Sequence, residues 1–72
     1  MKKGNYPLYR LEIDHAPYKV TRTDFTSYQS AKRAFNKAKE AGCEYLQIAG
    51  ILFDNKGEEK SERILDCWSM AL

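Results

Sequence analysis

Residues 26–53, TSYQSAKRAFNKAKEAGCEYLQIAGILF, hold the pattern that decides the fold. In the first half of this stretch, apolar side chains recur every three or four residues, which predicts a helix with one face toward a core. These side chains are Tyr28, Ala31, Ala34, Phe35, Ala38 and Ala41. Thr26 and Gln29 predict a capping box at the start of the helix, with Ser27 as a competing cap, and Gly42 predicts its end.

The second half of the stretch, residues 45–53, is apolar at both sets of alternate positions. This pattern indicates an interior strand that is covered wholly or partly on both faces. Before the helix, residues 8–14 and 18–23 alternate apolar with polar side chains, which is typical of half-buried strands. We expect these two segments to form a hairpin with Pro17 in the turn or at the start of its second strand, since proline cannot donate to the ladder.

After the interior strand, Asp54–Gly57 has the composition of a turn. Residues 63–70 predict the last strand, and the charged residues 58–62 predict an extended loop or a frayed strand end. The order of elements is therefore ββαββ. We expect an α+β fold of two layers, in which one helix packs on one face of a four-stranded, mainly antiparallel sheet. The order of the strands in the sheet stays open at this point.

Length and composition limit what this chain can be. Its 72 residues allow one core, so we expect a single domain over residues 1–72 with a loose N-terminal end at residues 1–6. No apolar run reaches the length of a membrane span or resembles a signal peptide, which predicts a cytoplasmic protein. The cysteines, Cys43 and Cys67, are expected to be two small buried thiols rather than a disulfide.

Residues that carry chemistry are few. His15 is the only histidine and stands in a predicted turn, where a solvated side chain is the simplest interpretation. One histidine and two separate cysteines lack the short ligand spacing of a zinc site. The glycines are scattered and do not form a phosphate-binding loop. We therefore expect no enzymatic activity, no metal site and no cofactor.

The second face of the sheet is the first candidate for binding. One helix covers only one face, and we expect Val20, Leu65 and Cys67 to point toward that helix, with Thr21 on the opposite face. The opposite face would then carry an apolar cluster of a size that soluble monomers rarely expose, with a tryptophan of the kind enriched at binding hot spots. The candidate protein-binding residues are Tyr45, Ile51, Phe53, Ile64 and Trp68. Either a protein partner or a second copy would cover this cluster, or the ends of the chain would fold over it.

The outer face of the helix is the second candidate. Residues 1–39 hold nine Lys and Arg against three Asp and Glu, a net charge of +6, whereas residues 40–72 have a net charge of −4. Part of the basic half projects from the helix on the side away from the core, where it suits contacts with phosphates. The candidate nucleic-acid-binding residues are Lys32, Arg33, Asn36, Lys37 and Lys39. A solvated helix face of good helix formers is the structural alternative.

The run Phe25-Thr26-Ser27-Tyr28-Gln29-Ser30-Ala31, the end at Ala41-Gly42, the turn at residues 54–57 and the closing Ile64-Leu65-Asp66-Cys67-Trp68 resemble small proteins of phages and mobile elements. The resemblance covers about residues 8–69 and lies in the architecture. Some of those proteins are anti-CRISPR proteins or other inhibitors of host complexes. The resemblance implies a non-catalytic protein that blocks a host complex by binding it. We therefore expect a module that recognises a protein partner, and the basic face of the helix gives nucleic-acid binding as the alternative.

Overall fold

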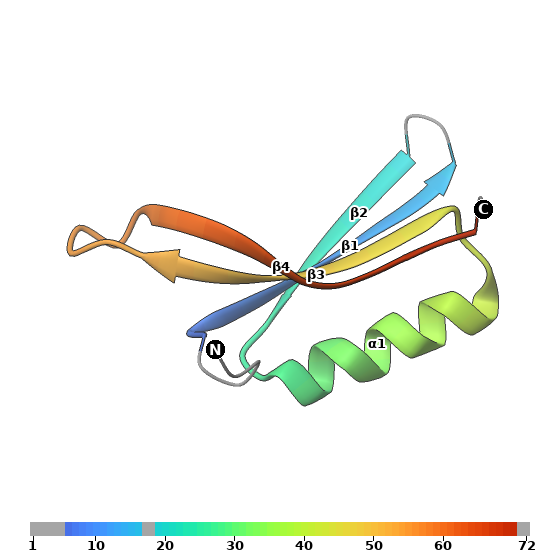
Figure 1. Cartoon of the computed structure of the whole chain (residues 1–72), viewed down its shortest axis with the longest axis horizontal. Coiled ribbons are helices and arrows are strands. Elements are labelled where there is room, and N and C mark those ends of the chain that lie inside the picture. Colours follow the sequence, from blue (N-terminus) through green and yellow to red (C-terminus); the bar gives the residue numbers. More distant parts are fainter. Residues whose placement is uncertain (1–5, 17–18, 71–72) are drawn as a thin grey trace.

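The computed structural model describes residues 6–16 and 19–70. It contains β1 (Leu8–Ala16), β2 (Lys19–Phe25), α1 (Tyr28–Ala41), β3 (Tyr45–Phe53) and β4 (Glu59–Ser69). All four strands form one antiparallel sheet in the order β2-β1-β3-β4, and α1 packs on one face of it (Figure 1). The α+β fold predicted from the sequence is therefore confirmed.

The strand order resolves the connection that the sequence left open. Both β2 and β3 pair antiparallel with β1, so the two strands that α1 connects run parallel to each other with β1 between them. The helix accordingly crosses the middle of the sheet. The two hairpins diverge, and the turn between β3 and β4 extends beyond the helix (Figure 1). This arrangement leaves β2 and β4 as the edge strands.

The core lies between α1 and the two central strands. Ala31 and Phe35 of the helix are buried against a cluster that includes Leu11, Leu46 and Ile48. The expectation of a loose end at residues 1–6 is wrong for Tyr6, which is 6% exposed and belongs to this cluster. Residues 1–5 and Pro17 lie outside the described residues.

Local signals place the ends of the helix. Ser27, not Thr26, is the N-cap, because its Oγ accepts a hydrogen bond of 3.2 Å from the Ser30 N–H. The helix begins at Tyr28, one residue later than a capping box on Thr26 requires. Gly42 ends it as predicted, with φ at +97° and its N–H donating to the Ala38 carbonyl at 3.0 Å.

The hairpin between β3 and β4 differs in one respect from the prediction. The turn is confirmed: Asp54 Oδ1 accepts hydrogen bonds from the Lys56 and Glu58 N–H groups, and Gly57 has φ at +83°. However, β4 begins at Glu59, within the charged run that was expected to be a loop or a frayed end. A fully exposed part of an edge strand needs no apolar side chains, and for that reason charge alone was a poor guide here.

The side chains of β2 and of residues 66–68 in β4 lie on the opposite face of the sheet from the one predicted, whereas Ile64 and Leu65 lie as predicted. Trp68 stands opposite Leu46, and Asp66 opposite Ile48, so both lie on the helix side of the sheet. A register shift between Ile48 and Ala49 interrupts the alternation of β4, which places Ile64 and Cys67 together on the second face. In β2 the reversal follows from Phe25, which packs on the core and brings the alternate threonines to the helix side.

Candidate nucleic-acid interface

The outer half of α1 is open to solvent because the helix lies over the centre of the sheet. It approaches β1, β2 and β3, but no Cα atom of the helix comes within 8 Å of one in β4. Its 14 residues therefore present a full-length outer face. Gln29, Arg33, Asn36 and Lys37 are all exposed there.

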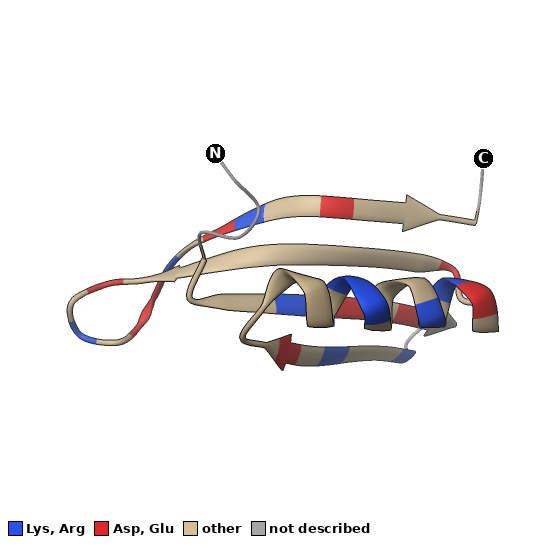
Figure 2. Cartoon of the chain, turned by 90° about the horizontal axis from the view of Figure 1, so that it is seen from below, with Lys and Arg blue, Asp and Glu red and all other residues tan. Residues whose placement is uncertain are grey.

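This face is basic. Four cations and one carboxylate project from α1, and the cations recur from its second turn to its last (Figure 2). These residues are Lys32, Arg33, Lys37, Lys39 and Glu40. Four of the five predicted nucleic-acid-binding residues are thus cations of one helix, and the structure brings them together as the helical spacing indicated. Asn36, the fifth, lies among them.

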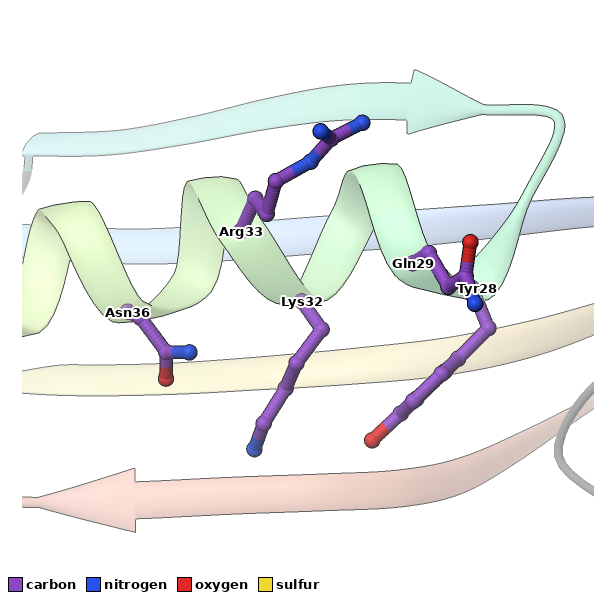
Figure 3. Close-up of a pocket in the computed structure, with 5 residues that line it drawn as sticks. All are labelled: Tyr28, Gln29, Lys32, Arg33 and Asn36. Carbon is purple, nitrogen blue, oxygen red and sulfur yellow. The ribbon is translucent and has the colours of Figure 1, made fainter.

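A shallow pocket of about 370 Å³ forms on this face (Figure 3). It is lined by Tyr28, Gln29, Lys32, Arg33 and Asn36. Arg33 leans toward β2, whereas Lys32 and Tyr28 lean toward β4 (Figure 3). The lining thus combines two amides, two cations and one phenol ring, with no carboxylate. Sequence reasoning missed Gln29 and Tyr28 as members of this site, although their helical spacing from Arg33 and Lys32 could have indicated them.

Contacts with β4 hold one side of the pocket. The Tyr28 hydroxyl donates to Asp66 Oδ2, and the Lys32 ammonium lies 3.9 Å from the same oxygen. The Lys32 Nζ also lies 4.3 Å from the centre of the Phe35 ring. These contacts fix the position of Lys32 at the edge of the core, and Asp66 balances part of its charge.

The remaining cations differ in how far they are engaged. The Lys39 Nζ lies 5.9 Å from the centre of the Trp68 ring, a distance typical of a weak cation–π contact. Arg33 and Lys37 form no ion pair with any residue in the described part of the chain. These two side chains are therefore the most available for an anionic ligand.

The predicted apolar cluster on the second face does not assemble. Trp68 lies on the helix side, and Ile51 is completely buried although it lies on the second face. Tyr45 is half-buried at the other end of β3, where its hydroxyl donates to Gln47 Oε1 at 2.9 Å. Only Phe53, 39% exposed, and Ile64, 48% exposed, remain as accessible apolar side chains of the set.

Arg10 explains part of this burial. Arg10 stands opposite Ala49 of β3, and Glu59 stands opposite Phe53 of the same strand. The Arg10 Nη2 lies 2.8 Å from Glu59 Oε2. The ion pair therefore crosses β3 at Ile51, which lies between these two positions. The Arg10 Nε also lies 2.9 Å from Asp24 Oδ1. The hydrogen bond to Asp24 is the largest, and the one to Glu59 the second largest, of the causes that raise the pKa of Arg10 above its usual value. Its partners are far away in sequence, and no local pattern could have shown them.

The other end of the second face is acidic and partly buried. Burial raises the pKa of Glu12, and a hydrogen bond to Asp14 raises it further. Asp14 Oδ1 is buried without a hydrogen-bond partner among the described residues. Burial also raises the pKa of Tyr45. No three His, Cys, Asp or Glu side chains in residues 6–16 and 19–70 are grouped so that they could hold a metal ion.

His15 and the two cysteines are the side chains that were considered for catalysis. His15 is exposed, and its Nε2 lies 3.0 Å from the Thr21 hydroxyl. Both cysteines are free, but only Cys43 is buried, where burial raises its pKa. The expectation that Cys67 is also buried is wrong, since it lies on the open second face of β4.

No helix in the described part of the chain has both the length and the apolar surface needed to cross a bilayer. Comparison with protein-family models, with curated proteins and with solved structures found no match to this chain.

Proposed function

We propose that this protein is a non-catalytic nucleic-acid-binding module that uses the outer face of α1. The observation that supports this proposal is the pocket on that face, whose lining joins two cations and two amides and contains no carboxylate. Cationic side chains bind phosphates, and asparagine and glutamine side chains form bidentate hydrogen bonds with adenine. Asn36 and Gln29 lie close to Lys32 and Arg33, so one ligand can reach both kinds of group.

The shape of the helix favours duplex DNA as the ligand. A helix of 14 residues is about 21 Å long. The major groove of B-DNA is about 12 Å wide and admits a helix, whereas the deep groove of duplex RNA does not. Arg33 and Lys37 would contact the backbone on the β2 side of the helix, and Lys32 and Lys39 would contact it on the β4 side.

Arg33→Glu is the variant that tests this proposal. We expect it to weaken binding of a fluorescently labelled DNA duplex by at least about tenfold at low salt, because it replaces a phosphate contact with a repulsive charge. The measurement is fluorescence anisotropy over a salt series, in which the affinity of the native protein should fall steeply as counterions compete. Lys56→Glu, in the turn of the β3–β4 hairpin, makes the same charge change far from α1 and should leave the affinity nearly unchanged.

Two results would contradict the proposal. The first is that the native protein does not bind the duplex at low salt. The second is that Arg33→Glu and Lys56→Glu reduce binding equally, which would assign the affinity to net charge rather than to the helix face. Single-stranded DNA and duplex RNA belong in the same assay, and tighter binding of either would contradict the choice of ligand.

Recognition of a protein partner is the second candidate function. The observation that favours it is the exposure of Phe53 and Ile64 on one face of the β3–β4 hairpin, which extends beyond the helix (Figure 1). A host complex of the kind that the resemblance to phage proteins implies would contact this hairpin. Such a partner would leave the outer face of α1 free.

A further inference from the structure

The two edge strands of the sheet are unlike. The pairing of β4 with β3 is interrupted by register shifts at two places, a feature that protects sheet edges from further pairing. In contrast, β2 pairs with β1 in unbroken register from Val20 to Phe25. Its side chains from Lys19 to Asp24 are all exposed. Valine, threonine and phenylalanine favour strands, so β2 is a regular edge that a further strand can join.

The charges on the second face of β1 and β2 alternate. Arg10 is opposite Asp24, with Nε 2.9 Å from Oδ1, and Glu12 is opposite Arg22, with Oε1 3.2 Å from Nε. The side chains of Arg22 and Asp24 remain 63% and 45% exposed, respectively. Each of these two side chains can therefore still meet an opposite charge on its outer side.

We propose that a second copy of this chain pairs with β2, antiparallel and about a two-fold axis at Thr23. Arg22 then stands opposite the partner's Asp24, and Asp24 opposite the partner's Arg22. Each row of charges continues with alternating sign across four strands. Starting from Arg10, one row runs through Asp24 to the partner's Arg22 and the partner's Glu12. On the helix side, Thr23 faces the partner's Thr23, a favourable cross-strand pair.

The same charges select this register. In an antiparallel pair, residues that stand opposite each other point to the same face of the sheet. A two-fold axis perpendicular to the sheet must therefore lie at a residue of β2, which then stands opposite its own copy, and not between two residues. An axis at Arg22 or Asp24 sets that residue against its own copy, and like charges directly opposite each other destabilise a sheet. An axis at Thr21 leaves Arg22 opposite the partner's Val20. Only the axis at Thr23 forms both ion pairs.

Pairing of this kind has a structural consequence. The sheet becomes continuous over eight strands, and both copies of α1 lie on the same side of it. At the usual spacing between strands, β1 would lie about 14 Å from the β1 of the second copy. Arg33 leans toward β2 in each copy, so both arginines would face the space between the helices (Figure 3). This inference stands independently of the proposed function.

Thr23→Lys tests the inference. By sedimentation equilibrium at protein concentrations up to about 1 mM, the native protein should approach twice the monomer mass of 8.4 kDa. Thr23→Lys places two like charges on the axis and should weaken the dimer by at least about tenfold. Ser61→Lys adds the same charge to an exposed position of the other edge strand, β4, and should leave the dimer intact.

Disulfide cross-linking tests the register. In a Cys67→Ser background, Thr23→Cys should form an intermolecular disulfide rapidly on oxidation, since opposed Cα atoms in an antiparallel pair lie about 4.5 to 5.5 Å apart. Thr21→Cys should not, because it would lie about 14 Å from its copy. The inference is overturned by a monomer at all concentrations, by equal effects of Thr23→Lys and Ser61→Lys, or by faster cross-linking of Thr21→Cys.

Discussion

Replacing Phe35 with alanine is expected to lower the free energy of unfolding by about 3 to 5 kcal/mol. The ring is 3% exposed and belongs to the cluster that joins α1 to the sheet. Its removal leaves a cavity between the helix and the central strands, and it also removes the ring beneath the Lys32 ammonium. For a chain of 72 residues, total stability is about 4 to 11 kcal/mol, so this variant loses a large part of it.

Urea denaturation followed by circular dichroism measures this effect. The matched control is Lys37→Ala, a substitution at an exposed position of the same helix. It should change stability little, since alanine is at least as good a helix former as lysine. Equal stability of the Phe35→Ala variant and the native protein would place Phe35 outside the core and contradict the packing of α1 on the sheet.

Gly50→Ala is expected to destabilise the protein by about 1 to 3 kcal/mol, although it adds a single methyl group. A Cβ atom at this position would lie 2.5 Å from Cγ of Tyr6, which is closer than real Cβ contacts allow. The Tyr6 ring would have to move. Its movement would disturb the edge-on contact with the Tyr9 ring and the hydrogen bond from the Tyr6 N–H to the Tyr9 hydroxyl.

A double-mutant cycle isolates this cause. In a Tyr6→Ala background the clash is absent, so adding Gly50→Ala should cost much less than it does in the native protein. The same denaturation assay measures all four proteins. An equal cost of Gly50→Ala in both backgrounds would show that the effect comes from the strand itself rather than from the contact with Tyr6.

The elements formed by local signals could be predicted from the sequence. The interior strand has the predicted bounds, residues 45–53, because both sets of alternate positions are apolar. Gly42 ends the helix because it adopts a positive φ. The start of the helix differs by one residue because Thr26 and Ser27 both have capping hydroxyls, and their sequence context did not separate them.

Features that depend on distant segments could not be predicted in this way. The direction of Trp68 depends on a register shift in the pairing of β3 with β4, which no pattern within β4 shows. Part of the burial of Ile51 comes from the ion pair between Arg10 and Glu59, which meet only in the folded sheet. For these reasons the predicted apolar cluster, which spans two strands, does not assemble, whereas the predicted basic residues lie together because they belong to one helix.

The outer face of α1 as a nucleic-acid interface is tested most directly by amide chemical-shift mapping. The protein, labelled with ¹⁵N, would be titrated at low salt with a short DNA duplex. The largest changes are expected along the exposed side of α1, at Gln29, Lys32, Arg33 and Asn36, with little change in the β3–β4 hairpin. Changes confined to Phe53, Ile64 and their neighbours, or no changes at all, would contradict it.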